Sequence, residues 1–308
     1  MNPYDYRWLN GQIICNQEEN TPLWTRHSLN FANSFSGRLI GDSPVMADYC
    51  FPRGIKRAPL AILLHGMGGK NPAHCQRIAQ TLARQGIASV ILYLVFNIKR
   101  LPSSIRAKYP KLTAEEWFES YQYSVIDVRQ IVDWAQTRAE IDTNKICVIG
   151  YSFGSFISSI AMAVDKRIKA GVLIESGGNS GKMTKHSAVM RWTYKQDANQ
   201  YRRDQELYTQ YLQEVEKKGF ENLVAPRDSY LMDPLTFSCD LKGRPLLMVS
   251  ALFDEMIPRV STLDFWKANG KPPLYWYPST HSSLWVWYPW FSRRLIDFLK
   301  ASFDGSNK

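Results

Sequence analysis

The stretch KICVIGYSFGSF, residues 145–156, decides the fold. An apolar, β-type run leads into Gly150, and the chain continues as Gly-x-Ser-x-Gly around Ser152. The pattern alone is weak evidence, and it becomes strong when a strand precedes it and a helix follows it. Apolar residues at helical spacing, Ile157 and Ile160, do follow. The sequence therefore predicts Ser152 on a tight strand-to-helix turn, where glycines on either side avoid clashes with the neighbouring strand and helix.

The rest of the chain alternates between short apolar runs and amphipathic segments. We expect strands at 58–66, 87–94, 145–149, 170–176, 244–254 and 271–279, and helices at 71–86, 117–137, from Phe153 onward, at 259–268 and at about 290–303. Continuous apolar strands that alternate with helices are typical of a parallel sheet covered on both faces. The predicted class is α/β, with a mostly parallel central sheet, and residues 36–52 predict an antiparallel hairpin added at its edge.

Residues 178–242 interrupt this alternation. They are polar and contain one amphipathic helix, marked by Leu207, Tyr211 and Val215, but no run that suits a buried strand. Long insertions that leave a sheet and rejoin it are often functional. We therefore expect one domain over residues 1–308, with 178–242 as a cap or lid, or else as a decorative insertion.

Composition excludes several classes of protein. The net charge is +10, but the Lys and Arg are dispersed, so we expect no nucleic-acid partner. No apolar run approaches the ~20 residues of a membrane-spanning helix, and the first residues lack the apolar core of a signal peptide. The 5 cysteines are scattered without metal-ligand spacing, which argues against a disulfide framework and a zinc site. These features favour a cytoplasmic protein, and they define no oligomeric state.

A serine nucleophile needs a base, usually histidine, oriented by a carboxylate. Of the 5 histidines, His281 alone lies just beyond the last predicted strand, where its loop reaches the same sheet edge as Ser152. His65 ends a strand beside a glycine and is better suited to ordering a loop. His281 is therefore the predicted base.

Three carboxylates compete for the role of triad acid. Asp254 follows the strand after the insertion and completes the chain order Ser, Asp, His. Its neighbour Glu255 is one alternative. Glu175, at the end of the strand after the nucleophile, is the more serious one. We favour Asp254, because a loop that carries Asp and then Pro258 before a helix suits a fixed carboxylate.

The developing oxyanion of acyl transfer needs backbone donors. The N–H of Phe153 follows the nucleophile at a helix start, and it is the first candidate. The loop HGMGGK at the end of strand 58–66 supplies the second, for which we favour Met67 over Gly68.

The motifs HGMGG, GYSFG, LFDEMIP and the late STH occur in an order that resembles the α/β-hydrolase superfamily, in its esterase and dienelactone-hydrolase-like branch. The likeness spans about residues 40–300 without the insertion. It implies Ser152 as nucleophile, Asp254 as acid, His281 as base, and Met67 and Phe153 as oxyanion donors. It also implies an acyl-enzyme, without metal or organic cofactor.

The expected activity is that of a serine hydrolase, most simply a carboxylesterase acting on a small or medium apolar ester. A prolyl-oligopeptidase-like peptidase is the nearest alternative. It would need an acidic anchor for a free amine, and Glu206, Glu214 and Glu216 are present in the insertion. A catalytically silent hydrolase fold used for binding is the other alternative, since fold does not imply function. The aromatic run SSLWVWYPWF, 282–291, is expected to anchor the last helix to the sheet rather than to form an apolar binding surface.

Overall fold

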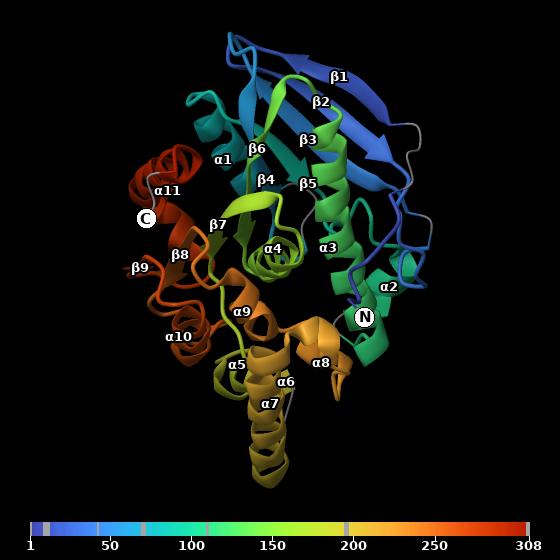
Figure 1. The fold of residues 1–308 in the computed structure, drawn as a ribbon, viewed down its shortest axis with the longest axis vertical. Coiled ribbons are helices and arrows are strands. Elements are labelled where there is room, and N and C mark those ends of the chain that lie inside the picture. Colours follow the sequence, from blue (N-terminus) through green and yellow to red (C-terminus); the bar gives the residue numbers. More distant parts are fainter. Residues whose placement is uncertain are drawn as a thin grey trace.

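A computed structural model describes residues 2–8, 13–41, 43–68, 72–108, 111–193 and 197–305. Within these residues the core is a 9-stranded sheet in the order β1-β2-β3-β5-β4-β6-β7-β8-β9 (Figure 1). Strands β4 to β9 run parallel to one another, whereas β1, β2 and β3 form an antiparallel extension joined to β5. The strands are β1 (Ile14–Asn20), β2 (Trp24–Phe31), β3 (Val45–Pro52), β4 (Ala58–Leu64), β5 (Ala88–Leu92), β6 (Ile141–Tyr151), β7 (Ile168–Ile174), β8 (Leu246–Ala251) and β9 (Leu274–Tyr277).

Helices cover both faces of this sheet. One face packs against α3 and α4, and the other against α1 and α11. The helices are α1 (Ala73–Ala83), α2 (Ser103–Lys108), α3 (Ala114–Gln136), α4 (Phe153–Val164), α5 (Ser180–His186), α6 (Met190–Thr193), α7 (Ala198–Lys218), α8 (Asp228–Leu231), α9 (Ser238–Leu241), α10 (Arg259–Ala268) and α11 (Tyr288–Phe303). In the described ranges no helix is long and apolar enough to cross a membrane.

Strand β4 shows why the apolar runs are continuous. Ile62 and Leu64 belong to the core beneath α3 and α4, while Ala61 and Leu63 belong to the core beneath α1 and α11. All four are 0% exposed. Because successive side chains of a strand point to opposite faces, a strand buried on both faces has to be apolar at every position.

The long helix α3 begins where its sequence provides a cap. The side chain of Thr113 accepts the N–H of Glu116, and the Glu116 carboxylate accepts the N–H of Thr113 in return. This capping box satisfies two amide groups that a helix N-terminus leaves without an internal partner. It fixes the start of the helix that carries Trp117 and Tyr121.

The α/β class and the mostly parallel sheet are confirmed, and the six parallel strands overlap the predicted segments, although β6 begins four residues and β7 two residues earlier than predicted. The predicted hairpin over 36–52 is wrong. Only β3 forms there, and it pairs with β2 rather than with residues 36–44. Strands β1 and β2 were not predicted, because polar residues dominate their sequences ICNQEEN and WTRHSLNF.

The insertion 178–242 contains no strand within its described residues and forms α5 to α9 beyond the ends of the parallel strands (Figure 1). Its predicted amphipathic helix is α7. Tyr211 and Val215 are buried as predicted, but Leu207 is 46% exposed and Tyr208 takes its place on the inner face.

The aromatic run after His281 packs mainly inward. Trp285, Tyr288 and Phe291 are buried, whereas Trp290 is 57% exposed. The indole of Trp285 stacks on the ring of His74 in α1 at 4.0 Å between ring centroids. These contacts fit the interpretation that the run anchors α11 to the body of the protein.

Candidate active site

Ser152 lies on a sharp turn between β6 and α4. Its backbone has φ 53° and ψ −119°, a conformation that a non-glycine residue adopts at a cost and that is concentrated at functional sites. The turn needs glycine on both sides. A Cβ on Gly150 would lie 2.2 Å from the carbonyl oxygen of Gly154, and one on Gly154 would lie 2.3 Å from the carbonyl oxygen of Leu64.

Because these contacts are with backbone, we expect Gly154→Ala to lower the free energy of unfolding by about 3 kcal/mol or more, through forced main-chain shifts. For a chain of this size that corresponds to a Tm decrease of roughly 5 °C. Gly181→Ala in α5 is the control, since its new Cβ would meet only the flexible end of Gln205. Thermal unfolding followed by circular dichroism measures both. Equal Tm values for the two variants would contradict this account of the turn.

Ser152, His281 and Asp254 are connected by hydrogen bonds. The Oγ of Ser152 lies 2.9 Å from Nε2 of His281, and Nδ1 of His281 lies 2.8 Å from Oδ2 of Asp254. The three residues follow β6, β9 and β8, whose carboxyl ends meet at one edge of the sheet. That is where ligands bind in open α/β folds.

The loops that carry Asp254 and His281 are held in place. Oδ1 of Asp254 accepts the backbone N–H groups of Met256 at 2.8 Å and Ile257 at 2.7 Å, which leaves Oδ2 for the imidazole. Glu255, an alternative acid at the sequence level, uses Oε2 to accept the backbone N–H of His281 at 3.0 Å. It therefore anchors the loop and not the ring.

Glu175 also reaches the ring. Its Oε2 lies 3.0 Å from Nδ1 of His281, so two carboxylates face one nitrogen. Burial opposes the charged imidazole, but the hydrogen bonds and charges of Asp254 and Glu175 outweigh it and raise the pKa of His281 to about 10. Burial raises the pKa of Glu175 itself to about 8, against the lowering effect of His281. The sequence presented Glu175 and Asp254 as alternatives, and the structure brings both to the histidine.

The ligand atoms of Glu175, Asp254 and His281 lie within 4.8 Å of one another, a spacing that a metal ion would also accept. A cation there would need the lone pair of Nδ1. With the ring serving as a base at Nε2, Nδ1 carries the proton and donates it to a carboxylate. The two uses of the cluster exclude each other.

Tyr151 is a supporting residue that the sequence analysis missed. Its hydroxyl donates to the carbonyl oxygen of His281 at 3.2 Å, and its ring lies 5.5 Å from the imidazole. The only sequence signal was its position next to the nucleophile.

The two predicted oxyanion donors lie on separate segments. Phe153 is the first residue of α4, and the first amides of a helix have no partner within it. Met67 lies in the loop after β4, which is described as far as Gly68. His65 orders this loop as expected. Its Nε2 accepts the N–H of Leu94 at 3.0 Å, so Nδ1 carries the proton and donates to the carbonyl of Gly66 at 2.5 Å. Burial lowers the pKa of His65 and keeps it neutral.

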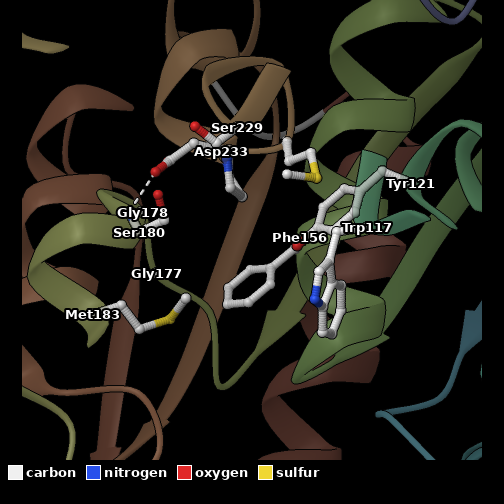
Figure 2. Close-up of a pocket in the computed structure, with 11 residues that line it drawn as sticks. Trp117, Tyr121, Phe156, Gly177, Gly178, Ser180, Met183, Ser229 and Asp233 are labelled. Carbon is white, nitrogen blue, oxygen red and sulfur yellow. Dashed lines mark hydrogen bonds between the residues drawn. The ribbon is translucent and has the colours of Figure 1, made fainter. Parts of the chain in front are cut away.

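A cavity of about 130 Å³ is lined by Phe156, which lies in α4 four residues after Ser152 in the sequence (Figure 2). The core supplies Trp117, Tyr121 and Phe156, and the rings of Tyr121 and Phe153 are 5.3 Å apart between centroids. The segment after β7 and the insertion supply the other walls. These walls are Gly177, Gly178, Ser180, Met183, Ser229, Met232, Asp233 and Pro234.

Asp233 is the charged residue in that wall, and its carboxylate is fully used. It accepts the backbone N–H groups of Asn179 at 2.9 Å, Ser180 at 2.5 Å and Leu235 at 3.0 Å. The carboxylate thus ties the start of the insertion to its end, and the space beside it is lined mostly by apolar side chains.

Comparisons with known proteins agree with the fold. A family model described as "alpha/beta hydrolase fold" matches residues 59–210. No curated protein matches the sequence significantly.

Solved structures with a similar fold include two esterases. The acetyl xylan esterase from Paenibacillus sp. R4 has a TM-score of 0.67 at 19% identity, with 96% of this chain and 89% of that chain covered. Acetyl Xylan Esterase 1 from Thermoanaerobacterium sp. JW/SL YS485 has a TM-score of 0.65 at 15% identity, with 97% and 90% covered. An acylaminoacyl peptidase from Pyrococcus horikoshii has a TM-score of 0.63 at 15% identity, with 91% of this chain and 42% of that chain covered. At these identities the likeness is one of fold.

Proposed function

We propose that this chain, which belongs to the α/β-hydrolase superfamily, is a serine carboxylesterase that cleaves esters of small apolar acids. The observation that carries the proposal is the continuous hydrogen-bonded series from Ser152 Oγ through the ring of His281 to Asp254. The esterases among the similar structures support the same reaction class.

The geometry suits acyl transfer. His281 takes the Ser152 proton at Nε2 while Oγ bonds to the ester carbonyl carbon, and Asp254 stabilises the imidazolium that results. The N–H groups of Phe153 and Met67 donate to the oxyanion. The protonated ring then gives its proton to the departing alkoxide, which leaves Ser152 acylated. Water, activated by the same ring, attacks the acyl-enzyme and releases the acid.

The cavity beside Phe156 is our candidate for the acyl-binding pocket. Its volume of about 130 Å³ is close to the roughly 150 Å³ of an apolar cavity that holds benzene. Acetyl to butyryl groups fit such a space and an octanoyl chain exceeds it. In this proposal the insertion 178–242 is a cap, because its residues form much of the wall.

A p-nitrophenyl ester series tests the function and the pocket together. We expect the wild-type kcat/KM for acetate and butyrate to exceed that for octanoate by about 10-fold or more, because the long chain does not fit. A wild type inactive on all three esters would contradict the proposed function.

Trp117→Ala enlarges the same wall and tests the assignment of the pocket. We expect it to raise the octanoate-to-butyrate ratio of kcat/KM by about 10-fold, since removing an indole opens room for several methylenes. Trp290→Ala, at a 57% exposed position on α11, is the matched control and should leave the ratio unchanged. If the two variants give the same ratio, the acyl group binds elsewhere.

A peptidase is the second candidate, favoured by the fold shared with the acylaminoacyl peptidase. An enzyme that selects a free amine needs an unpaired anion in its pocket. Asp233 is saturated by amides, and Glu214 pairs with Lys217 and Lys218 on the exposed side of α7. We therefore expect alanine p-nitroanilide, whose α-amine is free, to be cleaved far more slowly than p-nitrophenyl acetate. The opposite order would favour the peptidase.

A further inference from the structure

We propose that Glu175 is a second acidic partner of His281, which lies close enough to Nδ1 to orient the imidazole in place of Asp254. The inference rests on the proposed function, because it assigns a role in the same reaction. A triad of the usual kind has one carboxylate at this nitrogen.

The two distances are nearly equal, although only the contact with Asp254 has hydrogen-bond geometry, and both carboxylate oxygens of Glu175 are buried without a hydrogen-bond partner among the described residues. Nδ1 of His281 lies 2.8 Å from Oδ2 of Asp254 and 3.0 Å from Oε2 of Glu175. Asp254 lies after β8 and Glu175 after β7, and these strands are neighbours in the sheet. The N–H of Nδ1 is therefore directed at Asp254, and the carboxylate of Glu175 lies beside it at the adjacent strand end, where it can accept the same N–H if Asp254 is removed.

Glu175 has few other ways to stabilise a charge. It is 1% exposed, and its ion pair with His281 is its one ion pair in the part of the chain that the structure describes. A buried carboxylate is stable only when it is paired or protonated. Asp254 differs, because two backbone amides already hold its Oδ1. The imidazole of His281 is thus the group that can stabilise a carboxylate at position 175.

The backbone supports a functional placement. Glu175 has φ 51°, one of the few positive values at non-glycine residues in the described segments. Its N–H donates to the carbonyl of Val249 in β8 at 2.7 Å, which fixes the residue as β7 ends. A large side chain adopts this conformation at a cost, and such costs are usually found where the position of the side chain matters.

The charged and titratable groups around Glu175 come from three loops. They are Tyr151 at the end of β6, Asp254 and Glu255 after β8, and His281 after β9. Tyr151, Asp254 and Glu255 are phenolic or acidic. Among these groups, therefore, only the imidazole of His281 can become a cation. Protonation of His281 during the reaction thus places the positive charge between Asp254 and Glu175. No bond to Glu175 forms or breaks, which makes it a positioning residue.

The test is a double-mutant cycle with Asp254→Ala, Glu175→Ala and the combined variant. A triad that depends on one carboxylate loses about 10⁴-fold in kcat when that acid is disabled. Here we expect Asp254→Ala to lower kcat by no more than about 100-fold, because Glu175 still orients the ring. The combined variant should lose about 10⁴-fold or more, beyond the product of the two single losses.

The pH profile separates positioning from a merely structural role. Glu175 is one of the two acidic side chains that raise the pKa of His281, so the acidic limb of kcat/KM should move to lower pH in Glu175→Ala and in the more conservative Glu175→Gln. Glu214→Gln, on the exposed face of α7, should not move it. Circular dichroism and Tm identify a variant that fails to fold. If Glu175→Ala fails to fold, the pH profile of Glu175→Gln is compared with that of the wild type.

The outcomes are distinguishable. The proposal is overturned if Asp254→Ala lowers kcat as much as the combined variant does. It is also overturned if neither Glu175 variant shifts the acidic limb of the kcat/KM profile. EDTA should leave the activity unchanged. If EDTA abolished the activity, the cluster of Glu175, Asp254 and His281 would instead be a cation-binding site. If the wild type has no activity that depends on Ser152, the proposed function itself fails, and this role for Glu175 fails with it.

Discussion

Ser152→Ala should lower kcat for p-nitrophenyl butyrate by about 10⁴- to 10⁶-fold, because the acyl-enzyme cannot form without Oγ. The loss should leave the structure intact. Ser152 is the N-cap of α4, but its side chain makes no capping hydrogen bond. Initial rates together with circular dichroism measure both effects.

Ser292→Ala is the matched control for this substitution. Its hydroxyl bonds only to the carbonyl of Pro289 within α11, so full activity is expected. A Ser152→Ala enzyme that retained a tenth of the wild-type rate would contradict the assignment of the nucleophile.

His281→Ala should reduce kcat by a similar factor, since Ser152 then has no base within hydrogen-bonding distance. The truncation leaves a space the size of an imidazole at the sheet edge. We therefore expect added imidazole to restore part of the rate, and to do so more strongly as pH rises and the free base becomes more abundant. Measuring kcat with increasing imidazole tests both statements.

His186→Ala in α5 controls for the loss of a histidine, because that side chain is exposed and lies outside the hydrogen-bonded series. It should keep the wild-type rate. If His281→Ala and His186→Ala were equally active, the base would have to be sought elsewhere.

The parallel sheet could be predicted because its strands are buried on both faces. That burial requires runs such as APLAILL in β4 and ASVIL in β5, which differ sharply from the amphipathic pattern of α3. Residues that follow the carboxyl ends of parallel strands meet at one edge. This rule is enough to explain how Ser152, Asp254 and His281, far apart in the sequence, could be grouped in advance.

Other features depend on contacts that no local pattern records. Strand β2 is recognisable only by its pairing with β1 and β3, because its polar residues lie on the less buried part of the antiparallel extension. The course of the insertion depends on Asp233, which accepts the amide of Leu235 nearby and the amides of Asn179 and Ser180 more than 50 residues away. A single buried aspartate gives no signal of such partners.

The choice between Glu175 and Asp254 also lay beyond the sequence. Both follow strands, those strands are adjacent, and either loop can reach the histidine. In the structure Glu175 lies 3.0 Å and Asp254 lies 2.8 Å from Nδ1 of His281, so both acids are close to the base. Glu255, one residue from Asp254, contacts the backbone of His281 instead, which shows how strongly side-chain direction decides such roles.

The central claim is that Ser152 is an activated nucleophile, and covalent labelling tests it most directly. A fluorophosphonate probe reacts with the serine of a working hydrolase and spares ordinary hydroxyls, since only an activated Oγ attacks phosphorus. We expect one adduct per chain, located by peptide mass spectrometry at Ser152 and absent from Ser152→Ala. An unlabelled wild-type protein, or an adduct on any other residue, would contradict the account.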